Sequence, residues 1–253
     1  MDLKKHPVAS KLLHNFLSSL KRDLAENLIA VYLYGSLATG DFVDELSDID
    51  LLIVMKNKVN LKQLNSLADL HQTFNSENND WSKRVDVAYL SEGSIKNIKD
   101  KPYQTIVSDG HGGIEIVHAP EYYLIDWYKV QEQSVTLFGP DAGKLMPRIS
   151  IDEFKEVVRC YMLDWPDKAA KADKRGLQAY IVVTLCRSLY AYKYGKHVSK
   201  RIGANWVVDE FPQWSSLIRQ SLKWSRDSEN SDVVDTKNKD ETIQFMNFML
   251  SRI

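Results

Sequence analysis

The sequence predicts an α+β protein in which an N-terminal mixed sheet with helices is followed by an all-α helical-bundle domain. Strand-like apolar runs occur at residues 28–34, 48–55 and 84–90. From residue 121 onward the apolar side chains recur with helical spacing instead. This change predicts two domains, 1–145 and 146–253, with a small mixed sheet confined to the first.

Each predicted element follows from its own periodicity. A helix over residues 10–26 precedes the first strand, because its leucines and its phenylalanine share one face. A second helix, 61–74, connects the second and third strands. Further helices are expected at 121–136, 152–164, 176–194, 199–210, 213–225 and 239–252. The polar segment 226–240 is expected to be a loop.

Composition limits the classes of function. The chain has 253 residues, 44% apolar and 26% charged, which suits a globular enzyme with a sizeable core. A net charge of −1 disfavours a nucleic-acid-binding protein, which would be basic overall or along a stripe. The first residues lack the apolar run and cleavage site expected of a signal peptide, and no apolar stretch approaches the ~20 residues needed to span a bilayer. We therefore expect a monomeric cytoplasmic protein without a membrane partner.

Residues 34–54, YGSLATGDFVDELSDIDLLIV, carry the strongest chemical signal. Asp48 and Asp50 are two residues apart at a strand, so their side chains point to the same face. Two adjacent carboxylates suit Mg²⁺, which is usually held by one or two carboxylates together with substrate phosphates. Gly35 allows a close backbone approach, and Ser36 offers a hydroxyl and an N–H to a phosphate oxygen. Together they predict a metal-assisted nucleotidyl-transfer site.

The alternative is that Ser47 and Asp48 are ordinary turn residues before a strand. Asp50 argues against it, because an unpaired carboxylate inside an apolar run is costly. A third acid, Asp86, lies in the alternating run at 84–90. Its alternative is a solvent-facing strand residue, but a buried acid usually has a partner. We expect Asp86 to serve as general base, as metal ligand, or as both.

These motifs resemble the signature of the polymerase-β-like nucleotidyltransferases, in which Gly-Ser is followed by two acids in a strand and a third acid on a later one. Segments in the second half of the chain make the resemblance more specific. Segments VVTLCR, YGK, SK and ANW, ending at Arg187, Lys196, Lys200 and Trp206, are similar to the helical domain of the streptomycin and spectinomycin 3''-(9)-type aminoglycoside adenylyltransferases. LFGPD, ending at Asp141, also matches that family.

The resemblance implies further site residues. Arg187 and Lys200 occupy the positions of a family arginine and lysine that bind nucleotide phosphates, and Asp126 aligns with a family acid that contacts the nucleotide. A triphosphate needs such cations besides metal, since Arg binds phosphate bidentately and Lys acts as a point charge. Without the resemblance, Arg187 would be read as an amphipathic-helix residue and Lys200 as a solvated surface lysine.

The chain departs from the family at substrate positions. Members that act on streptomycin have a tryptophan in the middle segment, and residues 106–113 contain none. Leu177 stands where those members have an acid near the start of the arginine-bearing helix. The third acid is Asp86 where the family usually has Glu, which shortens the arm by one methylene and alters its positioning.

The expected activity is therefore that of an adenylyltransferase. AMP would pass from ATP, with one or two Mg²⁺ ions, to a hydroxyl of an aminoglycoside or aminocyclitol antibiotic, and so confer resistance. Spectinomycin is favoured over streptomycin as acceptor. The alternatives are a nucleotidyltransferase that acts on a protein, RNA or metabolite, and a non-catalytic nucleotide-binding module.

Overall fold

The computed structural model describes residues 5–44, 47–77, 81, 84–100, 103–108, 113–224 and 232–253. By its internal contacts the chain divides into two compact units, Met1–Arg148 and Ile149–Ile253. The assignment of domains to 1–145 and 146–253 stays a prediction. Within the described ranges, no helix has the length and apolar character required to traverse a bilayer.

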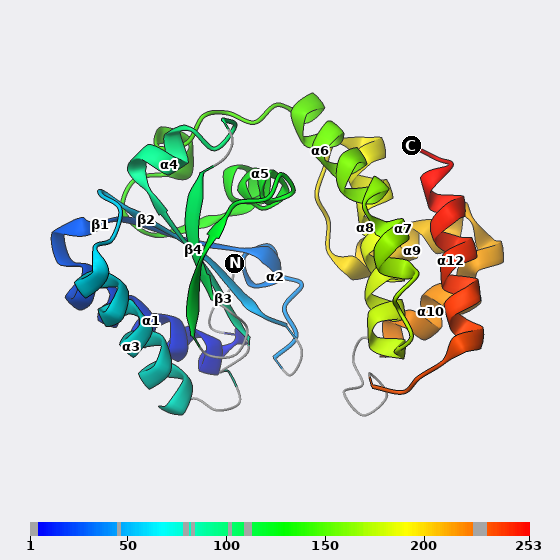
Figure 1. The fold of residues 1–253 in the computed structure, drawn as a ribbon, viewed down its shortest axis with the longest axis horizontal. Helices are drawn as coiled ribbons and strands as arrows, with labels where there is room; N and C mark the ends of the chain where they lie inside the picture. Colours follow the sequence, from blue (N-terminus) through cyan, green and yellow to red (C-terminus); the bar gives the residue numbers. More distant parts are fainter. Residues whose placement is uncertain are drawn as a thin grey trace. The chain divides into compact units, whose positions relative to one another are not determined.

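The first unit contains a mixed sheet with helices packed on it (Figure 1). Its strands are β1 (Leu28–Tyr34), β2 (Ile49–Met55), β3 (Val85–Ser91), β4 (Gln104–Ser108), β5 (Ile114–His118) and β6 (Val135–Phe138). Its helices are α1 (Pro7–Leu24), α2 (Gly35–Thr39), α3 (Leu61–Glu77), α4 (Glu92–Lys96) and α5 (Tyr123–Gln133), with short 3-10 turns at Ala25–Asn27 and Ala142–Lys144. The described strands form one sheet of order β5-β4-β3-β2-β1-β6. Strands β2 and β3 are parallel and the other neighbours antiparallel, which confirms the predicted mixed sheet.

The two faces of this sheet have different contents. Alternate residues of β1, β2 and β3, among them Val31, Leu51 and Val87, join one apolar core with α1 and α3. Because side chains alternate along a strand, the intervening residues point to the opposite face. Asp50 and Asp86 belong to that second set, on the side of the sheet away from the apolar core.

The predicted strands and helices of this unit form, with one error at the end of the 121–136 helix. Helix α5 ends at Gln133, and Val135–Phe138 forms β6 against β1. A β-branched pair, Val135 and Thr136, favours the strand, and pairing with β1 supplies the hydrogen bonds that helical continuation would have made. Strands β4 and β5 were not predicted, and residues 109–112 between them lie outside the described part.

The second unit is helical, as predicted. It contains α6 (Ile151–Leu163), α7 (Trp165–Ala169), α8 (Arg175–Tyr194), α9 (Lys200–Glu210), a 3-10 turn (Pro212–Trp214), α10 (Ser215–Trp224) and α12 (Thr236–Leu250). Helix α8 is central, because α6, α9, α10 and α12 all pack on it. Its buried side chains surround the helix, among them Ile181, Val183 and Leu185, so it lacks the single apolar stripe of a surface helix.

The expected loop at 226–240 is wrong at its C-terminal end. Helix α12 begins at Thr236, because the Asp235 side chain accepts a 3.0 Å hydrogen bond from the backbone N–H of Asn238 and so caps the first turn. Residues 225–231 lie outside the described part, so that portion of the expectation stays a prediction.

A glycine sets the contact between α8 and α9. At Gly203 an added Cβ would lie 2.6 Å from the Cα and 2.9 Å from the backbone nitrogen of Arg187. Backbone atoms of a packed helix cannot move aside as the end of a flexible side chain can. Gly203 therefore lets α9 approach α8 at the residue predicted to bind phosphate, and Lys200 begins α9 one turn earlier.

We expect Gly203→Ala to lower the free energy of unfolding by about 1–3 kcal/mol, the range for inserting an atom into a packed contact. Gly93→Ala is the matched control, because the nearest atom to its added Cβ is Ser91 Oγ at 3.9 Å. That change should be neutral or stabilising by up to about 1 kcal/mol, since Ala is the better helix former. Denaturant melts of both variants give the comparison, and equal stability of the two would contradict the assigned packing.

Candidate active site

Three predicted acids meet on adjacent strands. Asp50 of β2 is the register partner of Tyr34 in β1 and of Asp86 in β3. Residues directly opposite each other in neighbouring strands project to the same face, so the carboxylates of Asp50 and Asp86 lie side by side. Asp48 precedes β2 by one residue, and its charge acts on both of the others. The sheet register therefore gathers the acids that the motif predicted.

Gly35 is packed against one of these carboxylates. It follows β1 with φ +72°, a left-handed conformation that favours glycine. A Cβ at this position would overlap the side-chain oxygen of Asp50. Both the backbone angle and the close approach therefore require Gly at the turn from β1 into α2. The next residue, Ser36, is half-buried, and its carbonyl accepts the N–H groups of Gly40 and Asp41.

The pKa of Asp50 rises to about 7, and the first cause is burial of its carboxylate. The ammonium group of Lys129 opposes the rise, whereas the negative charges of Asp86, Asp126 and Asp48 add to it. A desolvated carboxylate among other acids is therefore stable as an anion only when a cation is near. This is the electrostatic demand that a divalent metal ion meets.

Asp86 is an exposed residue, yet the pKa of its carboxyl group rises to about 6, first because of partial desolvation and then because of the charges of Asp48 and Asp126. A hydrogen bond with the Ser108 side chain opposes that rise. The Ser108 hydroxyl also accepts the backbone N–H of Val87 at 3.0 Å, so it holds β3 beside the acid. With a pKa near 6, Asp86 is ionised at neutral pH and able to accept a proton.

Two residues of α5 complete the cluster, and one of them was missed in the sequence. The Nζ of Lys129 lies 2.6 Å from Oδ1 of Asp126, and their side chains are 13% and 31% exposed. Asp126 was predicted as a nucleotide contact, and its charge acts on Asp50, Asp86 and Tyr34. The sequence signal for Lys129 was its spacing of three residues from Asp126, since residues i and i+3 share a helix face.

The donor chemistry fits Mg²⁺ in an open site. Within the described ranges, no set of three or more His, Cys, Asp and Glu side chains is arranged to hold a metal by itself. A Mg²⁺ site completed by substrate phosphates needs only one or two carboxylates, and Asp48 with the buried Asp50 supplies that type of ligand. The metal-ligand roles of Asp48, Asp50 and Asp86 stay predictions.

The other two predicted phosphate ligands lie in the second unit. Arg187 is half-buried on α8, and Lys200 is the first residue of α9, with its Nζ 5.1 Å from the ring centroid of Tyr180. The close packing at Gly203 brings these two helices together. Their phosphate-binding roles stay predictions.

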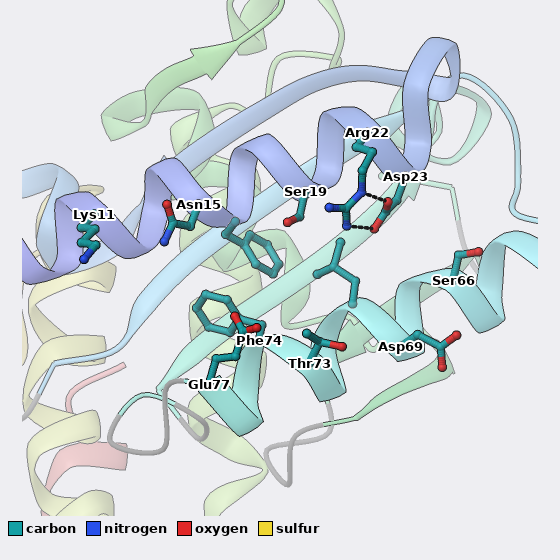
Figure 2. Close-up of a pocket in the computed structure, with 12 residues that line it drawn as sticks. Lys11, Asn15, Ser19, Arg22, Asp23, Ser66, Asp69, Thr73, Phe74 and Glu77 are labelled. Carbon is teal, nitrogen blue, oxygen red and sulfur yellow. Dashed lines mark hydrogen bonds and ion pairs between the residues drawn. The ribbon is translucent and has the colours of Figure 1, made fainter.

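A separate pocket of about 500 Å³ lies between α1 and α3, which pack on the face of the sheet opposite the acids (Figure 2). Its floor is the edge-to-face pair Phe16 and Phe74, and its rim is polar. On the rim Arg22 makes two hydrogen bonds with its neighbour Asp23. None of the predicted catalytic residues lines this pocket, so we assign it no part in the chemistry.

Comparisons with known proteins agree with this architecture. Residues 18–102 match the family model of the polymerase beta nucleotidyltransferase domain. Residues 144–252 match the model of the aminoglycoside adenylyltransferase C-terminal domain. The spectinomycin adenyltransferase AAD(9) from Enterococcus faecialis, solved with ATP and spectinomycin, has the same fold, with a TM-score of 0.69, 17% identity, and coverage of 96% of this chain and 98% of that one.

The curated relatives are also adenylyltransferases, at low sequence identity to this chain. A spectinomycin 9-adenylyltransferase of Campylobacter jejuni is 23% identical over 75% of this chain and 74% of its own length. One from Staphylococcus aureus is 21% identical, with 81% and 82% covered. An aminoglycoside (3'') (9) adenylyltransferase of Klebsiella pneumoniae is 26% identical, with 80% and 79% covered.

The titration of Asp50 predicts how stability depends on pH. Its folded-state pKa of about 7 lies above the ordinary 3.8, so its contribution to stability is complete below about pH 4 and is lost as the pH rises through 7. Metal-free Asp50→Asn should therefore exceed the wild type in unfolding free energy at pH 8, by on the order of 3 kcal/mol, and by less at pH 5.

Chemical melts in EDTA at the two pH values measure this difference. Exposed Asp100 serves as control, since Asp100→Asn should show no comparable change between pH 5 and pH 8. A constant difference between Asp50→Asn and wild type across this range would contradict the raised pKa.

Lys129 should set where Asp50 titrates. Replacing it in Lys129→Met removes the cation that opposes protonation, so the pKa of Asp50 should rise above its wild-type value by about one unit. Lys129→Arg keeps the charge and should leave the value near 7. Carboxyl ¹³C NMR titration of the metal-free proteins reports the pKa of Asp50 directly. An unchanged pKa in the Lys129→Met variant would show that Lys129 does not act on Asp50.

Three observations support one assignment of the chain. They are the two matched domain models, the adenylyltransferase fold and the three acids gathered by the sheet register. The chain carries a polymerase beta-type nucleotidyltransferase domain and an aminoglycoside adenylyltransferase-type C-terminal domain, and it is a nucleotidyltransferase.

Proposed function

We propose that this protein transfers AMP from ATP to a hydroxyl group of an aminocyclitol or aminoglycoside, with spectinomycin-like acceptors favoured over streptomycin. The reaction would require Mg²⁺, and modification of the antibiotic would confer resistance. The names of the curated relatives and the ligands of the AAD(9) structure support this class of acceptor.

The observation that carries the proposal is the pairing of Asp50 with Asp86. Parallel strands β2 and β3 place these residues opposite each other, and the charges of Asp48 and Asp126 reach both. A non-catalytic nucleotide-binding module has no need for a second acid with a raised pKa beside Asp50. Building such a cluster costs stability, which is expected where charge must be stabilised during a reaction.

The chemistry follows from the protonation states. The acceptor oxygen attacks the α-phosphorus of ATP and forms the new P–O bond, the bond between the α-phosphorus and the bridging oxygen breaks, and pyrophosphate leaves. Asp86, ionised at neutral pH, accepts the proton of the attacking hydroxyl. Mg²⁺ bound by Asp48 and Asp50 would neutralise phosphate charge. Positioning and electrostatics provide most of the catalysis in such transfers.

The remaining groups are assigned to the nucleotide. Gly35 leaves room beside Asp50, and Ser36 offers a hydroxyl to a phosphate oxygen. On the family resemblance, Arg187 and Lys200 bind the phosphates, and Asp126 contacts the nucleotide. The ion pair of Asp126 with Lys129 supports this last assignment, because it holds the acid in place beside the catalytic carboxylates.

Two sequence departures support spectinomycin over streptomycin. Leu177, where streptomycin-modifying members have an acid, is 40% exposed on α8 and offers a guanidinium or ammonium group no partner. The segment 106–113 has no tryptophan. An acceptor with fewer cationic groups therefore suits this chain better.

Asp86→Asn should lower AMP transfer to spectinomycin by about 10³-fold, within the range lost on removing a general base. Asp86→Glu should retain part of the activity, because it keeps the carboxylate and moves it by one methylene. Asp100→Asn is the control and should be as active as the wild type. Pyrophosphate release with Mg·ATP gives the rates, and more than a tenth of wild-type activity in Asp86→Asn would rule out its role as base.

An acceptor panel tests the substrate class with the same assay. Spectinomycin should stimulate pyrophosphate release, and streptomycin should do so far less. Release that needs no aminocyclitol, and appears instead with a protein, RNA or metabolite, would replace the antibiotic by another acceptor while the transferase assignment stands.

A further inference from the structure

Arg84 makes contacts that the reaction described above does not use. It lies two residues before Asp86, at the start of β3. Its Nη2 donates to the carbonyl oxygens of Asp44 at 2.7 Å and of Ser47 at 2.6 Å. Its own carbonyl accepts the backbone N–H of Ile49 at 2.8 Å. An arginine whose bonds go to main-chain groups acts on the backbone rather than on a counter-ion.

These bonds hold both peptide groups that flank Asp48. The carbonyl of Ser47 belongs to the peptide that enters Asp48, and the N–H of Ile49 belongs to the peptide that leaves it. With both peptide planes held, the backbone angles of Asp48 have little freedom left. Arg84 leads directly into β3, the strand that carries Asp86. These bonds therefore also fix the position of Asp48 relative to Asp86.

The guanidinium itself is held by aromatic side chains. Its Cζ lies 4.2 Å from the ring centroid of Trp81, which is 7% exposed. Trp81 stacks on Phe42 with the ring planes 3° apart. A planar cation fits such a face while its edge donates hydrogen bonds, and a lysine cannot do both.

Two described residues before Asp48, Val43 and Ser47, are also bonded to each other. The backbone N–H of Val43 donates to Ser47 Oγ at 2.9 Å, and the N–H of Ser47 donates to the carbonyl of Val43 at 2.8 Å. Asp44 accepts a 3.0 Å contact from His6. Arg84 thus attaches this hydrogen-bonded pair of residues to the start of β3.

We infer that Arg84 is a positioning residue for Asp48: by holding the two peptide groups on either side of it, Arg84 fixes this carboxylate relative to Asp86. The inference rests on the proposed metal-binding role of Asp48. Groups outside the ligand set that orient a metal ligand typically change metal affinity or activity by about 10–100-fold when removed. By its contacts with the backbone around Asp48, Arg84 is a group of this kind.

The test measures Mn²⁺ affinity by titrating protein into Mn·ATP without acceptor and following the water-proton relaxation enhancement that appears when the ion is bound to the protein. Arg84→Met should weaken Mn²⁺ binding about tenfold. Arg84→Lys, which retains charge but not the planar fork, should be weakened less. Arg22→Met is the matched control, because Arg22 is 71% exposed and its bonds go to the neighbouring Asp23 alone among described residues.

A double mutant separates positioning from general destabilisation. In an Asp48→Asn background, Arg84→Met should weaken Mn²⁺ binding by less than about twofold, because residues that act through one another are not additive. Full tenfold weakening in that background would overturn the inference. A metal-free readout accompanies it: amide hydrogen exchange at Ile49 should be faster in Arg84→Met than in wild type.

The outcomes distinguish this inference from the proposed function. Equal Mn²⁺ affinity in Arg84→Met and wild type overturns the role of Arg84 and leaves the metal site standing. Absence of Mn²⁺ binding by the wild type overturns the metal site, and the inference with it.

Discussion

Repulsion between neighbouring carboxylates that are partly desolvated is the constraint on which the first unit depends. The register of β1, β2 and β3 puts Asp50 between Tyr34 and Asp86 on one face of the sheet. Burial raises the pKa of both acids, the charge of Asp86 adds to the shift of Asp50, and the charges of Asp48 and Asp126 add to both shifts. A fold built for stability alone would place apolar side chains there, as it does on the opposite face.

The surrounding residues limit that repulsion without abolishing it. Lys129 opposes protonation of Asp50, and the Ser108 hydroxyl bonds to Asp86. Gly35 leaves the space that the Asp50 carboxylate occupies. The fold itself therefore positions the cluster, and preorganised charge of this kind is where much of the rate of phosphoryl transfer originates.

The relatives show that this arrangement tolerates wide change in sequence. Identities of 21–26% with curated adenylyltransferases accompany coverage of about three quarters or more of each chain.

By itself the sequence determined the class of fold and the identity of the acids. Alternation and helical spacing are local properties, so β1, β2, β3 and the helices of the second unit could be predicted from short windows. The end of the 121–136 helix could not, because β6 exists by pairing with β1, about a hundred residues away. Nor did local pattern predict β4 and β5, the short strands at the edge beyond β3.

Only the tertiary structure decided what surrounds the acids. Lys129 reaches Asp50 because α5 packs beside β1, and Arg84 reaches Ser47 because the chain returns to the sheet there. The spacing of Lys129 from Asp126 indicated a shared helix face, but no spacing in the chain indicated that Lys129 acts on Asp50 or that Arg84 bonds to Ser47, since a cation acts over a few ångströms in space. The motif named the carboxylates, and the packing around them determined their charge, their orientation and the residues that hold them.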